Sequence, residues 1–291
     1  MRAAEAAGPA ARPLPLFYAL SQAGRAIVAV RGGTSHRGHG LTLGSPADDV
    51  LATFIRPVES GKDPGQFQAV AAALQSLTLS DPVPLEALFA SLPETGHEIL
   101  ETASDRPRPL SVWPTTEPVV PVPGWETQVL VVFDESVRTA DDVQETLRAY
   151  PGAKARMGQS KMVAQQFGAP REWSPGGMGV RMMVKGDLDE VAPQYRILGR
   201  RWLRPALTGD SPPPNPLMTW WLLLFALSML ARYHPVAWVR ALDVNSSPVA
   251  VSLERAMRKA MDAVPQLVAE AIYQVPMLLP GHAVAGAEPF D

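Results

Sequence analysis

One run of side chains constrains this sequence more than any other: residues 217–231 are apolar around almost the whole circumference of a helix. Pro216 precedes the run and Arg232 follows it. A membrane-spanning helix needs about 20 apolar residues, and shorter runs are more typical of helices buried in a core. We therefore predict a core helix with no membrane span, and a fold that covers this helix on all sides.

The beginning of the chain offers a partner for that helix. Apolar residues at helical spacing form one stripe there: Leu16, Leu20, Ala23, Ile27 and Val30. Ser21 and Gly24 flank the stripe, and their small side chains would let another helix approach closely. The pattern predicts a helix over residues 14–31, ended by Gly32 and Gly33, that packs against residues 217–233.

Prolines divide the rest of the chain. The sequence contains 30 prolines, roughly twice the average share. Six of them lie between residues 105 and 124, which predicts a stiff extended connector. A second cluster occupies residues 212–216. Between the clusters, β-branched and amphipathic patterns predict three strands and one short helix, over residues 128–133, 179–184, 195–198 and 141–150 respectively.

The predicted fold class is α+β and predominantly α-helical, with a helical core built from both chain ends and a small β-containing insertion. Its parts are an N-terminal helical part, an α+β insertion and a C-terminal helical part, over residues 13–104, 125–204 and 211–280. We expect residues 1–12 to be disordered because they offer little to bury. Pro84 should open a short helix to residue 92, and Ser247 with Pro248 should open a long one that Pro265 kinks.

Composition excludes several kinds of chemistry. The formal net charge of −3 gives no general attraction to nucleic acid or to anionic lipid. The absence of cysteine excludes disulfides, thiolate zinc sites and cysteine nucleophiles, and it fits a cytoplasmic protein. No P-loop, dinucleotide fingerprint, zinc-protease pair, EF-hand loop or nucleophile elbow occurs. We therefore predict no metal and no cofactor, and the motifs do not decide whether the protein is an enzyme.

The densest polar cluster is formed by Arg31, His36, Arg37 and His39. Two imidazoles beside guanidinium groups can supply a general base and an anion clamp. The spacing of Arg31 and His36 also resembles the arginine–histidine signature of HEPN-type ribonucleases, which act on a ribose 2′-hydroxyl and a phosphate. The alternative is a solvated loop whose histidines bind local backbone groups.

A second group of candidates lies at the ends of the two long helices. The pair His39-Gly40 predicts a turn that directs the imidazole inward, where it would need a partner. Arg232 and Tyr233 either cap the apolar helix and cover the edge of the core, or Arg232 converges on one pocket with His39 and with Tyr18, Gln22 and Arg25. The last three form a stripe on the first helix, opposite its apolar side. We predict His39 and Arg232 as catalytic candidates. The predicted binding residues are Tyr18, Gln22, Arg25, Arg31, His36 and Tyr233.

Several segments together resemble the YaaC-like family of bacterial proteins. They are Pro15-Leu16-Phe17-Tyr18-Ala19-Leu20-Ser21, Gly24-Arg25-Ala26, His39-Gly40-Leu41, residues 85–94, residues 226–233 and Val264-Pro265. The resemblance implies a cytoplasmic bacterial protein without an established activity. In place of the basic run that the family tends to carry after its His-Gly pair, this chain has Thr42-Leu43-Gly44-Ser45, which weakens a nucleic-acid role.

Two functions follow as hypotheses. The first is a non-catalytic binding or regulatory protein that acts through a protein partner or a small ligand. The alternative is a HEPN-like, metal-independent endoribonuclease, a toxin or phage-defence effector that acts on RNA, which the net charge does not favour. Either function is compatible with a homo-oligomer.

Overall fold

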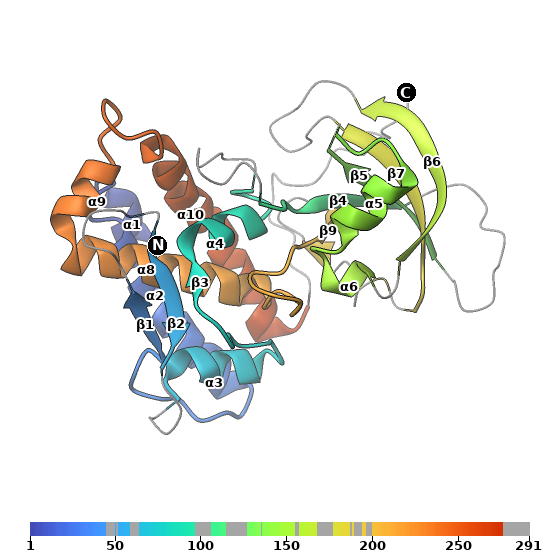
Figure 1. Cartoon of the computed structure of the whole chain (residues 1–291). Helices are drawn as coiled ribbons and strands as arrows, with labels where there is room; N and C mark the ends of the chain where they lie inside the picture. The colour runs from blue at the N-terminus through green and yellow to red at the C-terminus, as the bar shows by residue number, and fades with distance from the viewer. Residues whose placement is uncertain are drawn as a thin grey trace. The chain divides into compact units, whose positions relative to one another are not determined.

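The computed structural model describes residues 1–44, 50, 52–58, 64–96, 106–114, 127–134, 136–154, 157–167, 177–186, 188, 194–195 and 200–275. The chain divides into two compact units. The first combines Met1–Arg106 with Pro213–Met277, and the second contains Pro107–Pro212 (Figure 1). The fold is α+β and mainly helical, as the sequence patterns predict.

The first unit is a set of helices with a small sheet. Its elements are α1 (Arg2–Ala6), α2 (Pro13–Val30), β1 (Leu41–Gly44), β2 (Phe54–Pro57), α3 (Gln66–Ala73), β3 (Val83–Pro84), α4 (Leu85–Ser91), α8 (Pro216–Tyr233), α9 (Pro235–Ala241) and α10 (Ala250–Tyr273). The three strands form an antiparallel sheet in the order β1-β2-β3.

Helix α8 is the centre of this unit. Every residue from 217 to 228 is buried, and α2, α3, α4, α9 and α10 all contact the helix (Figure 1). By length and composition α8 could span a membrane, yet 72% of this 18-residue window is buried inside the unit, as in a core helix. The prediction that residues 14–31 and 217–233 pack together is confirmed.

Helix α2 packs closely on α8 through a glycine. A Cβ atom added to Gly24 would lie 2.5 Å from the indole of Trp221 and 2.9 Å from Cγ2 of Val70. The predicted apolar stripe is partly wrong, because Val30 is 56% exposed whereas Phe17 is buried. Helix α2 contacts α10 as well as α8, so its buried face is rotated relative to the predicted stripe.

The predicted end of α2 is confirmed. Gly32 has a φ angle of +71°, a left-handed conformation that glycine adopts without strain. The N–H of Gly33 donates to the carbonyl of Val28 at 2.9 Å, so one of the last helix carbonyls is satisfied as glycine-terminated helices require.

The expected disorder of residues 1–12 is wrong. Ala4, in α1, is fully buried. The side chain of Arg12 donates to the carbonyls of Ala4 and Ala7 at 3.2 and 3.0 Å, and Nε1 of Trp238 donates to the carbonyl of Ala10 at 2.8 Å. These long side chains order a segment whose own residues offer little to bury.

Two other helix starts were predicted with different success. Helix α4 begins at Leu85, directly after Pro84, and the predicted inward residues Leu85, Leu88 and Phe89 are buried. Helix α10 begins at Ala250 with no side-chain cap, so Ser247 does not cap it. The chain around Ser247 instead forms a turn stabilised by Asp243, whose carboxylate accepts bonds from Asn245 and Ser246.

In its described residues, the second unit contains an antiparallel sheet and the helices α5 and α6. Its elements are β4 (Leu110–Pro114), β5 (Thr127–Phe133), α5 (Ala140–Leu147), α6 (Pro151–Lys154), β6 (Met157–Phe167), β7 (Gly177–Val184), β8 (Gln194–Tyr195) and β9 (Arg200–Leu203). The strand order is β6-β7-β5-β4-β9-β8. A hydrophobic core joins residues of α5, such as Val143 and Leu147, to sheet residues such as Val131 and Val180.

The predicted stiff connector between residues 105 and 124 is wrong for residues 110–114, which form a strand of the sheet. Strand β4 pairs there with both β5 and β9, and Val112 is buried. Four residues without proline are enough to pair, and Pro114 falls at the end of the strand, where a missing N–H is tolerated. Parts of the predicted segments lie outside the described residues: 97–104, 115–126, 196–199 and 276–280.

The strands predicted at residues 128–133 and 179–184 correspond to β5 and β7, and the helix predicted at 141–150 corresponds to α5. Strands β6 and β9 were not predicted. Residues 200–203 carry two arginines before the buried Trp202 and Leu203, so the run has few apolar side chains to signal a strand.

Candidate functional site

The loop between α2 and β1, residues 32–40, carries both candidate histidines. It is held by the first residue of α3: Oε1 of Gln66 accepts a hydrogen bond from the Ser35 hydroxyl at 2.7 Å and another from the His36 backbone N–H at 3.1 Å. The first N–H groups of a helix have no partner inside the helix. Those of Gln66 and Phe67 donate instead to the carbonyls of Gly38 and His39, at 2.7 and 3.1 Å.

The end of this loop is a tight turn at the predicted position. Gly40 has a φ angle of +76°, and its carbonyl accepts a 2.7 Å bond from Nε2 of Gln68. Gly65 lies so close that a Cβ atom on it would fall 2.1 Å from the Gly40 nitrogen. Only glycine fits there, and this close contact sets the position of His39.

The His39 imidazole lies against two aromatic rings. Its centroid is 5.5 Å from that of Phe17 and 5.7 Å from that of Phe225, both in tilted arrangements. Partial burial lowers the pKa of His39 below its ordinary value, and the positive charge of Arg232 lowers this pKa further. His39 is exposed, so the predicted inward direction of its imidazole is wrong. Among the described residues the imidazole has no hydrogen-bond partner, and its contacts are with the two rings. The lowered pKa favours the neutral imidazole at pH 7.

Arg232, at the end of α8, lies within electrostatic reach of His39. Its Nη1 donates to the hydroxyl of Tyr18 at 3.2 Å, and its Cζ lies 5.4 Å from the ring centroid of Tyr233. No carboxylate in the described part of the chain pairs with this guanidinium. We call Tyr18, His39, Arg232 and Tyr233 the Arg232 cluster.

The alternative for Arg232 and Tyr233 was that they cap the end of α8 and cover the edge of the core. Arg232 bonds the Tyr18 hydroxyl, and the C-terminal cap of α8 is made by the His234 backbone N–H, which donates to the Leu230 carbonyl at 2.9 Å. Tyr233 is 62% exposed. Both side chains are therefore at the surface and accessible to a ligand.

The other α2 candidates are less closely connected. Gln22 and Arg25 are exposed and lie about one and two helical turns beyond Tyr18 on the same face. Within the described residues, no recorded contact joins either of them to the Arg232 cluster. They extend the polar surface of α2 and are not part of the cluster itself.

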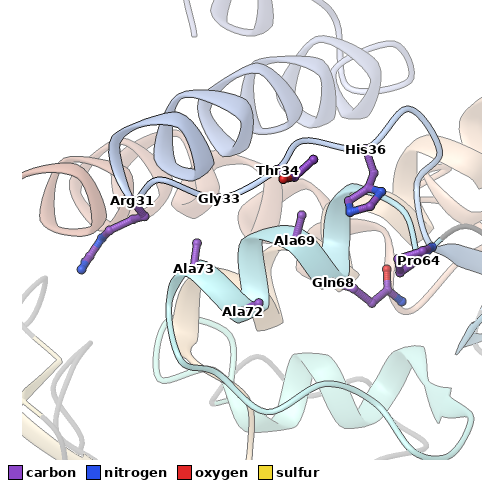
Figure 2. A pocket seen from close by; sticks show the side chains of 9 residues that line it. All are labelled: Arg31, Gly33, Thr34, His36, Pro64, Gln68, Ala69, Ala72 and Ala73. Carbon is purple, nitrogen blue, oxygen red and sulfur yellow. The ribbon is translucent and has the colours of Figure 1, made fainter.

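Arg31 and His36 belong to a different place. Both line a groove of about 440 Å³ between the loop and α3, together with Gly33, Thr34, Pro64, Gln68, Ala69, Ala72 and Ala73. Nε and Nη2 of Arg31 donate to the carbonyl of Ala271 in α10, at 3.2 and 3.1 Å. Figure 2 shows the Arg31 side chain at one end of the groove, directed away from His36 at the other. The structure does not bring this sequence pair together.

Sequence reasoning missed the residues that support the site. Gln66 and Gln68 hold the loop, and Phe225 supports the imidazole, yet none belongs to a motif. The one signal for this turn in the sequence was Gly65, because glycine is common where the chain turns. Its φ angle in the structure is positive, as such a turn requires. In the described ranges no three His, Asp or Glu side chains gather closely enough to hold a metal ion.

A family model described as "YaaC-like Protein" matches residues 1–272. The chain belongs to the YaaC-like family. The match runs through both units of this YaaC-like chain, including the β-containing region that carries none of the family-like segments. No curated protein and no solved structure matches the chain, and none of these comparisons shows a HEPN-type domain.

Proposed function

We propose that this YaaC-like chain is a non-catalytic binding protein that takes an anionic group, a carboxylate or a phosphate, of a small ligand or protein partner at the Arg232 cluster. One observation carries the proposal. The Arg232 guanidinium is held at the surface between Tyr18 and Tyr233, without a carboxylate partner among the described residues.

The geometry supports an anion because the guanidinium is positioned in advance. Arginine presents five N–H donors in a planar fork that matches carboxylate and phosphate oxygens. The bond to Tyr18 occupies Nη1, and the other nitrogen atoms keep donors for a ligand. A side chain that is already ordered loses less conformational entropy when it binds.

His39 gives this proposal a pH signature. A negative charge near an imidazole favours its protonated form, so a bound anion should raise the pKa of His39, which Arg232 and burial hold below the ordinary value. By linkage, binding should take up protons and tighten as the pH falls from 7 toward 6.

The test is a titration of the full chain with inorganic phosphate and with acetate at low ionic strength, followed by calorimetry and by the NMR signals of His39. We expect saturable binding that weakens at least tenfold in Arg232→Gln. The matched control is Arg240→Gln, an exposed arginine in the last turn of α9, which should bind as the parent does. No saturable binding of either anion, or equal binding by Arg232→Gln, would contradict the proposal.

One observation also supports the ribonuclease alternative, because His39 and Arg232 lie within electrostatic reach of each other. An imidazole can act as a general base while a guanidinium holds a phosphate. The test is incubation of the purified chain with RNA in the presence of a chelator. Cleavage that His39→Ala abolishes would establish the enzyme and refute a purely binding role, and intact RNA would exclude the alternative.

A further inference from the structure

The exposed face of α3 has an unusual composition. A surface helix ordinarily carries charged or polar side chains on its solvent side. Helix α3 contains no charged residue, and its alanines that line the groove are Ala69, Ala72 and Ala73 (Figure 2). Since none of these side chains extends beyond a methyl group, they form a flat apolar floor beside the helix backbone.

Polar groups are gathered on one side of this floor. Figure 2 shows the His36 ring directed from the loop toward α3, with the Gln68 amide at the same end of the groove. Gln68 donates through Nε2 to the Gly40 carbonyl at 2.7 Å, and its Oε1 is buried against Gly40. Thr34 is exposed and also lines the groove. The groove therefore offers a ring and a hydroxyl beside a methyl floor.

The charges of the lining residues narrow the class of ligand that the groove can bind. No carboxylate is among the lining residues that the structure describes, so none of these residues favours a cation. The guanidinium of Arg31 is bound to the Ala271 carbonyl and is directed away from His36 (Figure 2), so it does not clamp an anion inside the groove. The volume of about 440 Å³ falls within the range of roughly 300–1,000 Å³ that is common for small-molecule sites.

We propose that this groove is a second binding site, for a small, flat, uncharged heteroaromatic ligand of the nucleobase type. The ring lies on the methyl groups of α3 and stacks with His36, as bases stack on aromatic and histidine side chains. Its edge exchanges hydrogen bonds with the Thr34 hydroxyl. The Gln66 bonds to Ser35 and His36 hold the loop in place, so the site exists before the ligand binds.

The test uses adenine, uracil and nicotinamide as probes, with saturation-transfer NMR and calorimetry on the full chain. We expect saturable binding of at least one probe, weakened at least tenfold in Ala72→Phe, which fills the groove. Ala72 is exposed, so the larger ring needs no rearrangement of the core. The matched control is Ala26→Phe, an exposed alanine of α2 outside the groove, which should bind normally.

A second variant keeps the test independent of helix α3. Thr34→Val removes the hydroxyl from an exposed loop position and should weaken binding about threefold to tenfold, the loss expected for one hydrogen bond. Arg232→Gln should bind the probes as the parent chain does, which separates this site from the Arg232 cluster. The inference is wrong if none of the three probes binds, or if Ala72→Phe and Thr34→Val both bind normally.

Discussion

Two sides of helix α2 meet α8 in very different ways. On the buried side, Gly24 lets the Trp221 indole approach the α2 backbone, and the ring of Phe17 packs edge-on against that indole with centroids 6.1 Å apart. On the exposed side, the contact is one hydrogen bond between Tyr18 and Arg232. The buried side has the composition of a protein core, and the exposed side has the polar composition of a surface.

The difference is sharpest between two neighbours in the sequence. Phe17 is 1% exposed and Tyr18 is 50% exposed, because consecutive residues on a helix point about 100° apart. Burial supplies the stabilising free energy, roughly in proportion to apolar area. The buried side of α2 therefore stabilises the helix pair, and the exposed side is left to vary in function at small cost to folding.

The largest effect is expected for Phe17→Ala. Removal of a buried aromatic side chain costs about 3–5 kcal/mol in the free energy of unfolding, because contacts are lost and a cavity remains. Tyr18→Ala, one residue away and exposed, should cost less than about 1 kcal/mol. Urea unfolding at pH 7 measures both values. Equal losses of stability in the two variants would show that the exposed Tyr18 contributes as much to stability as the buried Phe17 does.

Gly24→Ala should have the next largest effect. The added methyl group would overlap Trp221 and Val70, and overpacking of this kind costs about 1–3 kcal/mol. The higher helix propensity of alanine offsets up to about 1 kcal/mol of that loss. Gly8→Ala is the control, because a Cβ atom there meets nothing within 4 Å. Thermal unfolding of the two variants that shows no difference would contradict the close approach.

A smaller effect is expected from pH through His39. The folded pKa is lowered below the ordinary value of 6.5, so the unfolded chain binds more protons in the window between the two. The contribution of His39 to stability is complete above pH 6.5 and is lost as the pH falls through that window toward the folded pKa. Urea unfolding of the parent chain and of His39→Phe from pH 7.5 to 5 should show a difference in stability that changes in this direction. A difference independent of pH would contradict the lowered pKa.

The smallest effect on stability is expected for Arg232→Gln, about 0.5 kcal/mol or less, because the residue is exposed. Its effect on His39 is specific. Loss of the guanidinium charge should raise the pKa of His39, but not to the ordinary value, because burial is the larger cause of the shift. An NMR titration of the imidazole signals measures this change, with Arg240→Gln as the control. An unchanged pKa would mean that the two side chains do not interact.

Part of the candidate site was accessible from the pattern of residues. Tyr18 and Arg232 are 214 positions apart, yet both could be chosen, because Tyr18 belongs to the polar stripe of the first long helix and Arg232 ends the apolar helix that packs against it. The turn at Gly40 was predicted from the His-Gly pair, and its positive φ fits that turn. The buried side of α2 could not be predicted fully, because it depends on packing against α10 as well as against α8. The apolar stripe alone is compatible with the predicted and with the observed orientation of the helix.

Other features had no local signal at all. The ordering of residues 1–12 depends on Arg12 and Trp238, and the second of these is contributed by α9, far along the chain. Strand β4 was hidden among prolines because pairing with β5 and β9 decides its conformation. The separation of Arg31 from His36 is likewise decided by a distant group, the Ala271 carbonyl of α10.

By itself, the sequence determined the mainly helical class, the burial of residues 217–228 and the pairing of α2 with α8. These follow from side-chain periodicity and from the free energy of removing apolar surface from water, which both act over a single helix. Only the tertiary structure decided that aromatic rings flank His39, that Arg232 bonds Tyr18, and that Arg31 and His36 lie at opposite ends of a groove. Those outcomes depend on groups brought together from distant parts of the chain, and no local pattern specifies which groups will meet.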